Sequence, residues 1–430
     1  MNTRLIRIGA ALGAVLVAAP ALAQDLTFWS WRQEDRAAYE TFIDTFEAAN
    51  PGITVAFETF EAANYNTILA TALAGGTGPD VMMVRAYGGM ENVASAGYLE
   101  PLSTETVPAL ADFTTPALAA ETMRSDSQIY AVPFASQTQL VIYNKTIFDA
   151  NGLAEPQTWD ELMAAGQTLK DAGGPLFGDL GANVPAVFMA LQYQAGAQPF
   201  TYDPATPEAI GIDLNDDASK KVLDYWGGLV EKGLVGTQDQ FTPEYIAGVI
   251  GGDYATYISA AWAPGYLTGA GVGEGADAGV WKTAPLPQWD TDNPVSVNWG
   301  GSAFSVTSQA KNPELAAKAA FGLYADDASL TDGWQNQVIF PLNLKALNSP
   351  EFEDYEVPFF GGQQANKEVY VPAANAYTGM TYTPFGQYYF DAFTEQLAAI
   401  NEGAVTGSEA ADRLQEDVVG YAEEQGFTVE

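Results

Sequence analysis

The side chains of this sequence that could take part in chemistry are carboxylates, lysines and tyrosines, because the chain contains no histidine and no cysteine. This composition excludes a Ser-His-Asp triad, a thiolate nucleophile, a disulfide and a zinc site built on histidine or cysteine. A carboxylate-dependent secreted glycoside hydrolase or lyase stays open as an alternative. However, the expected strands and helices bring no pair of acids together. We therefore expect no catalytic residue, no cofactor and no metal site.

Candidate binding residues follow the ends of two predicted strands. In open α/β sheets a ligand lies outside the carboxyl ends of the strands, so side chains at those positions are predicted to face it. An arginine there could equally pair with one of the many acids of the chain. The candidates after the strand over residues 26–30 and after the apolar run 80–84 are Trp31, Arg32, Glu34, Arg85 and Tyr87.

The elements that must position these residues alternate between strand and helix. Tyr39, Phe42 and Phe46 recur at helical spacing between the strands expected over residues 26–30 and 53–57. A second helix then leads to the apolar run 80–84, and this order predicts an α/β fold with a mostly parallel sheet. The glycine-rich stretch before Asp80 is expected to be a turn, because no lysine follows it and Asp80 would repel a phosphate.

A chain of 430 residues is too long for one core and suggests two domains. Residues 128–145 have β-rich flanks around a polar bend at Ser136 and Gln137, which suits a segment that crosses between domains; a single bent strand within one domain is the open alternative. Residues 295–306 repeat the pattern around Trp299 and Gly300, and residues 341–350 could form a third crossing.

Two further aromatic residues are candidates for binding. Trp262 follows a strand expected over residues 254–259, so its ring is predicted to point into a cleft. Tyr382 lies in a loop before the last two helices, where packing at the surface is an equal alternative. Trp159 is instead expected to be structural, under a helix whose start has Thr158 as cap and Glu161 three residues later.

The N-terminus and the charge predict where the protein works. Residues 1–23 have Arg4 and Arg7, an apolar run and an Ala-Leu-Ala cleavage site, as in a secretory signal peptide; a retained anchor is the alternative. The net charge of −37 argues against nucleic acid and anionic membranes as partners. We expect a periplasmic protein.

These motifs together resemble the extracellular solute-binding proteins of bacterial ABC importers, in the carbohydrate branch that includes maltose-binding protein. The matching segments, in chain order, are the signal, Leu26-Thr-Phe-Trp, Gly-Thr-Gly-Pro-Asp80-Val, Ile129-Tyr-Ala-Val-Pro133 with Leu140-Val-Ile-Tyr-Asn-Lys145, Pro156-Gln-Thr-Trp-Asp-Glu-Leu162, Trp262, and Gly300-Gly-Ser-Ala-Phe-Ser-Val306 with Lys311-Asn-Pro-Glu314. The first crossing departs from the family in offering Ser136 and Gln137 without an acid, so the family's ligand contacts do not carry over intact.

The resemblance implies a two-lobed periplasmic-binding-protein fold, with a mainly parallel sheet flanked by helices in each lobe and two or three hinge crossings. The expected lobes are residues 24–135 with 300–345 and residues 136–299 with 346–430. It also implies a monomer that captures a carbohydrate or polyol, without nucleic acid, and delivers it to the membrane permease subunits of an ABC importer; a sensory or adhesion role is the alternative. Sugar rings stack on aromatic faces, and their hydroxyls suit amides, carboxylates and arginine. The expected stacking residues are Trp31, Trp262, Trp299 and Tyr382, and the expected polar ones are Arg32, Glu34, Arg85, Ser136 and Gln137.

Overall fold

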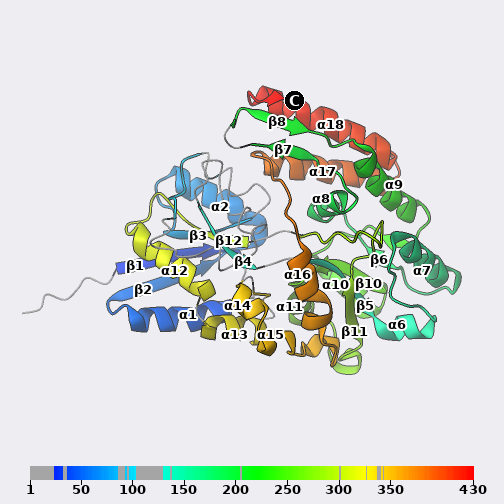
Figure 1. Cartoon of the computed structure of the whole chain (residues 1–430), viewed down its shortest axis with the longest axis horizontal. Helices are drawn as coiled ribbons and strands as arrows, with labels where there is room; N and C mark the ends of the chain where they lie inside the picture. Colours follow the sequence, from blue (N-terminus) through cyan, green and yellow to red (C-terminus); the bar gives the residue numbers. More distant parts are fainter. Residues whose placement is uncertain are drawn as a thin grey trace, which may run out of the picture.

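The computed structural model describes most of the chain after residue 23. The described residues are 24–31, 36–85, 93, 96–102, 129–135, 138–203, 206–299, 302–325, 327–336, 340–341 and 343–430. The predicted signal segment therefore lies outside them. The described elements gather into two lobes that lie side by side (Figure 1).

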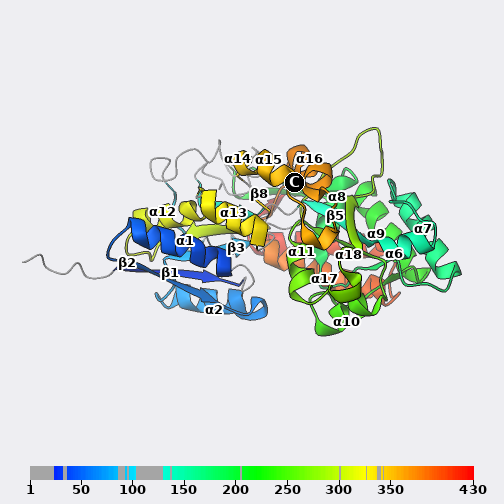
Figure 2. The ribbon, with the colours of Figure 1, turned by 90° about the horizontal axis from the view of Figure 1, so that it is seen from below.

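The first lobe is built on a five-stranded sheet in the order β2-β1-β3-β12-β4. Figure 2 shows α1, α12 and α13 on one face of this sheet and α2 on the other. The predicted apolar stripe of α1 is confirmed, because Tyr39, Phe42 and Phe46 are buried against the sheet. The elements are β1 (Gln24–Ser30), α1 (Arg36–Ala49), β2 (Ile53–Thr59), α2 (Ala62–Ala74), β3 (Val81–Arg85), β4 (Val132–Ala135), β12 (Ser302–Val306), α12 (Pro313–Ala325) and α13 (Asp327–Asn336).

Asp80 explains the Gly-x-Pro-Asp motif of this lobe. Its buried carboxylate accepts hydrogen bonds from the backbone N–H and the hydroxyl of Thr27, both at 2.9 Å, and from the Lys311 N–H at 3.1 Å. These bonds join β1, the start of β3 and the approach to α12. The glycine-rich stretch before it ends α2 and forms the turn into β3, as predicted.

The second lobe contains three small sheets, ordered β10-β5-β11, β13-β8-β7 and β6-β9. Helices surround them on the right of Figure 1. The strands are β5 (Gln139–Asn144), β6 (Gly178–Asp179), β7 (Phe200–Tyr202), β8 (Ala209–Ile212), β9 (Val235–Gly236), β10 (Thr256–Ala260), β11 (Trp281–Pro285) and β13 (Thr428–Val429). The helices are α6 (Lys145–Ala150), α7 (Trp159–Asp171), α8 (Pro185–Gln194), α9 (Asp217–Glu231), α10 (Pro243–Gly251), α11 (Ala263–Gly269), α14 (Leu344–Leu347), α15 (Pro350–Glu353), α16 (Val371–Ala376), α17 (Gly386–Asn401) and α18 (Gly407–Glu424), with short helices at Gly275–Asp277, Pro358–Phe360 and Asn366–Tyr370.

The prediction of a mainly parallel sheet in each lobe is wrong for several of the strand pairs. In the first sheet β1 runs parallel to β2 and β3, but β12 runs antiparallel to both β3 and β4. In the second lobe β5 runs antiparallel to β10 and β11. An apolar run indicates that a strand is covered on both faces but not which way it runs. β12 enters the first sheet from the other lobe, so its direction depends on the crossing rather than on a βαβ unit.

Trp159 is structural, as predicted. It is 1% exposed and its indole N–H donates to Gln194 Oε1 at 2.9 Å. The predicted capping box is present: the Thr158 hydroxyl accepts from the Glu161 N–H, and the Glu161 carboxylate accepts from the Thr158 N–H. None of the described helices combines the length and the apolar character needed to cross a bilayer.

Two segments carry the chain between the sheets, side by side. β4 belongs to the first sheet and β5 to the second, so the chain passes from one lobe to the other between them, and β4 and β5 are not one bent strand. The return segment pairs with them: Thr138 bridges Asn298, and the Gln139 N–H donates to Val297 O at 2.9 Å. After α13, the chain reaches Leu347 and Phe352, which lie in a core cluster with Leu140 of β5. The exact lobe boundaries stay a prediction.

Candidate functional site

The structure describes the side chains of four of the predicted site residues. Arg85 ends β3, but its side chain lies outside the described residues. Arg32, Glu34, Tyr87, Ser136, Gln137 and Gly300 also lie outside them. The described candidates are Trp31, Trp262, Trp299 and Tyr382.

Trp31 lies at the carboxyl end of β1 in the first lobe, where a ligand was predicted. Its half-buried ring meets the ring of Tyr65 edge to face, with centroids 5.1 Å apart. The Tyr65 hydroxyl donates to the carbonyls of Trp29 and Met83. Tyr65 therefore joins the ends of β1 and β3 and supports Trp31 from α2.

Trp262 and Trp299 contact each other in the second lobe. Trp262 lies between β10 and α11, after the predicted strand, and is half-buried. Trp299 comes from the return crossing, and the two indoles meet edge to face with centroids 5.1 Å apart. Trp299 is only 6% exposed. It therefore supports the Trp262 ring more than it offers a face of its own.

Two further aromatic residues join these tryptophans and were not predicted. The Phe241 ring lies 5.7 Å from Trp262, 5.3 Å from Tyr266 and 6.3 Å from Trp299 between centroids. Tyr266 lies four residues after Trp262 on α11, a spacing that places both on one helix face and could have been recognised. Phe241 lies in the turn before α10, where sequence carries no comparable signal. We call Phe241, Trp262, Tyr266 and Trp299 the aromatic cluster.

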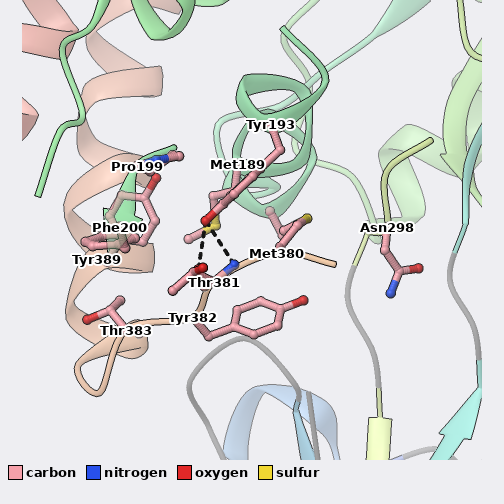
Figure 3. Close-up of a pocket in the computed structure, with 12 residues that line it drawn as sticks. Met189, Tyr193, Pro199, Phe200, Asn298, Met380, Thr381, Tyr382, Thr383 and Tyr389 are labelled. Carbon is pink, nitrogen blue, oxygen red and sulfur yellow. Dashed lines mark hydrogen bonds between the residues drawn. The ribbon is translucent and has the colours of Figure 1, made fainter. Parts of the chain in front are cut away.

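A hollow lies next to the aromatic cluster along the return crossing, because Asn298 lines the hollow and the following residue, Trp299, belongs to the cluster. Figure 3 shows Tyr193 and Met189 from α8 above it and Tyr382 below, with Asn298 on the side of the crossing. We call it the tyrosine pocket; its lining residues are Ala186, Met189, Tyr193, Pro199, Phe200, Asn298, Met380, Thr381, Tyr382, Thr383, Gly386 and Tyr389.

Tyr193 holds the loop that carries Tyr382. Its hydroxyl donates to the Thr381 carbonyl at 2.9 Å and accepts from the Thr381 N–H at 3.1 Å (Figure 3). Burial raises the pKa of Tyr193 to about 12, so the hydroxyl keeps its proton and can serve as both donor and acceptor. The backbone next to Tyr382 is therefore fixed from α8.

The chemistry of these surfaces suits a neutral molecule with apolar faces and hydroxyl groups. The lining of the tyrosine pocket is aromatic, thioether, hydroxyl and amide, with no Asp, Glu, Lys or Arg among its residues. The aromatic cluster adds ring faces. Across the described part of the chain, no three acids lie close enough together to hold a metal ion. Residues 290–293, which contain two aspartates, form a turn in which the Asp290 carboxylate accepts from the Asp292 N–H and the Asn293 amide.

Sequence comparison relates residues 29–330 to a family model described as bacterial extracellular solute-binding protein. The chain is 28% identical over 140 residues to a maltotriose-binding protein of Pyrococcus abyssi, a match that covers 33% of this chain and 29% of the relative. An uncharacterized ABC transporter extracellular-binding protein of Pyrococcus horikoshii is 25% identical over 309 residues, covering 69% of this chain and 66% of the relative. These matches span between about a third and two thirds of the relatives' length.

Solved structures share the fold over nearly the whole chain. A binding protein of an ABC transporter from B. animalis subsp. lactis, in complex with β-1,6-galactobiose, has a TM-score of 0.82 at 23% identity and covers 95% of this chain and 100% of its own. A galacto-N-biose- and lacto-N-biose I-binding protein of Bifidobacterium longum has a TM-score of 0.81 at 20% identity, with 95% and 99% covered. This likeness confirms the predicted two-lobed α/β fold.

Proposed function

Because the chain belongs to the bacterial extracellular solute-binding protein family, we propose that it captures a neutral sugar or short oligosaccharide between its two lobes and delivers it to the permease of an ABC importer. The observation that carries the proposal is the aromatic cluster beside the return crossing. A half-buried Trp262 supported by Trp299 offers a face for the C–H side of a sugar ring. The relatives named above support the same class of ligand.

The tyrosine pocket supplies polar groups of the kind that sugar hydroxyls need. Asn298 and the hydroxyls of Thr381 and Tyr382 line it next to the thioethers of its methionines. Amides and hydroxyls can both donate and accept hydrogen bonds, as the hydroxyls of a sugar also do. The first lobe would complete the site from Trp31 at the end of β1.

The mature chain would start after the predicted signal peptide, work in the periplasm as a monomer, and bind its sugar without changing it. It would not bind nucleic acid, because its net charge is −37. Arg32, Glu34, Arg85, Tyr87, Ser136, Gln137 and Gly300 stay proposed ligand contacts.

A thermal-shift screen of residues 24–430 tests this function. The panel contains maltotriose, β-1,6-galactobiose, lacto-N-biose, monosaccharides and polyols, with free amino acids and dipeptides as controls. A bound compound raises the melting temperature by mass action, and calorimetric titration then gives its dissociation constant. A sugar or polyol should bind. Stabilisation by amino acids or dipeptides alone would contradict the proposal.

A further inference from the structure

The turn at residues 238–241, before α10, contains a backbone outlier. Phe241 has φ 63°, the only non-glycine residue with positive φ in the part of the chain that the structure describes. Bulky residues rarely adopt this conformation, because their Cβ approaches the following carbonyl. A glycine would adopt it at a lower cost. The phenylalanine therefore occupies a position where the backbone conformation favours glycine.

Hydrogen bonds from the end of β6 and from the segment after it hold this turn. The Asp179 carboxylate accepts from the Gln238 N–H at 2.8 Å, and the Gln240 side-chain amide donates to the Asp179 carbonyl at 3.0 Å. The Asn183 side chain makes a pair of bonds with the Gln240 backbone, donating to its carbonyl at 2.8 Å and accepting from its N–H at 3.1 Å. Several hydrogen bonds that act on the same short stretch of backbone can hold it in a strained conformation.

Close packing fixes the turn from the same side. A Cβ on Gly181 would lie 2.5 Å from the Gln238 carbonyl oxygen, so only glycine lets the two backbones approach this far. On the other side of the turn, the Thr242 hydroxyl donates to the Asp239 carbonyl at 2.8 Å and caps α10. The turn is thus held before and after Phe241.

This strained and rigid turn presents its side chain to solvent. Phe241 is 49% exposed, and it is the only aromatic among the large apolar side chains that are exposed in the described residues. Its ring nevertheless contacts Trp262 and Tyr266, so it extends the aromatic cluster outward. A residue that served only to pack the start of α10 would bury its ring there.

We propose that Phe241 is a ligand-contacting residue that extends the platform of Trp262, and that Asp179 and Asn183 are positioning residues that hold it in place. The strain at Phe241 is retained because relaxing the turn would move the ring away from the cluster. The ligand contact rests on the proposed function, whereas the positioning of the turn does not.

The test compares Phe241→Gly, Phe241→Ala and a matched control, Ile250→Ala. Ile250 is also exposed, at 51%, but lies in the last turn of α10 and has no part in the cluster. With maltotriose, β-1,6-galactobiose and lacto-N-biose as titrants, both Phe241 variants should weaken binding of whichever sugar binds by about 5- to 50-fold, and Ile250→Ala should leave it unchanged. Phe241→Gly should melt at a higher temperature than Phe241→Ala, because glycine relieves the left-handed backbone.

A double-mutant cycle tests the positioning. Asp179→Ala should weaken sugar binding several-fold in the natural chain but not in the Phe241→Ala background, because Asp179 acts through that ring. Asp179→Asn keeps an acceptor for the Gln238 N–H and should retain binding. Equal effects of Asp179→Ala in both backgrounds, or unchanged binding in Phe241→Gly, would overturn the proposal.

A readout without ligand separates this inference from the proposed function. Hydrogen exchange at the amides of Gln238 and Gln240 should accelerate in Asp179→Ala and Asn183→Ala relative to the natural chain. If no sugar or polyol of the screening panel binds, the sugar proposal fails while exchange and melting still decide the positioning. Unchanged exchange, together with a Phe241→Gly protein no more stable than Phe241→Ala, would show that the turn is not held as described.

Discussion

Replacement of Trp262 by alanine should separate binding from stability. The Trp262 ring is half-buried and contacts the rings of Trp299, Phe241 and Tyr266. Removing a stacking face should weaken sugar binding by about 1–3 kcal/mol, by analogy with base–aromatic stacking, which is roughly 5- to 150-fold in dissociation constant. Because part of the ring faces solvent, the loss in free energy of unfolding should stay below that of a fully buried tryptophan.

Trp159 provides the matched comparison within the same lobe. It is 1% exposed and its N–H donates to the buried Gln194 Oε1. Its replacement by alanine opens a cavity and leaves that oxygen without a donor, so we expect a loss of about 3–5 kcal/mol or more in unfolding free energy. The folded fraction should still bind sugar with nearly the natural affinity, because Trp159 lies in the core.

Calorimetric titration and thermal melting of the two variants provide the assay, with a sugar identified by the screen. The expected result is a crossed pattern: Trp262→Ala loses affinity and keeps most of its stability, whereas Trp159→Ala loses stability and keeps affinity. If Trp262→Ala melts as low as Trp159→Ala and its folded fraction binds normally, then Trp262 is a core residue and the aromatic cluster is not the binding surface.

Three further predictions concern buried charge and chemistry. Asp80→Ala should lower the free energy of unfolding by roughly 3–5 kcal/mol, since three hydrogen bonds to a buried carboxylate from Thr27 and Lys311 are lost; a loss below about 1 kcal/mol in urea unfolding would contradict this role. Burial, aided by the nearby charge of Asp239, raises the pKa of Asp179 to about 7. Protonation of Asp179 therefore stabilises the folded state, and this contribution should fall as pH rises from about 4 to 7. Asp179→Asn should remove this part of the pH dependence. Identical pH profiles of the unfolding free energy for the natural chain and Asp179→Asn, measured by urea unfolding, would refute the prediction. Finally, excess oligosaccharide incubated with the mature protein should be recovered unmodified, and sustained release of new reducing ends would indicate a hydrolase instead.

The crossings between the lobes were predictable from sequence because a polar interruption between apolar flanks has a physical cause. Strands of two different cores need apolar residues, while the segment between the cores lies in a more polar setting. The polar residues Thr138 and Gln139 of the first crossing and Asn298 of the return crossing lie in the described part of these segments. The capping box at Thr158 was predictable for a similar reason, since its hydrogen bonds are local.

Features that depend on distant contacts were not predictable. The antiparallel pairing of β5 with β10 and β11 depends on the direction in which the chain returns to the sheet more than a hundred residues later. An apolar run does not indicate the direction of its strand. Phe241 belongs to the aromatic cluster because Asp179 and Asn183, about sixty residues earlier, hold its turn. Its left-handed backbone also has no signature in the sequence, since glycine rather than phenylalanine marks such positions.

Solution X-ray scattering of the mature protein tests the central proposal, capture of a sugar between two lobes, most directly. Scattering is recorded without ligand and with a saturating concentration of a sugar whose binding calorimetry has established. The crossing segments would act as a hinge, so we predict a smaller radius of gyration in the presence of that sugar. An unchanged radius of gyration with the sugar bound would contradict capture by closure of the two lobes.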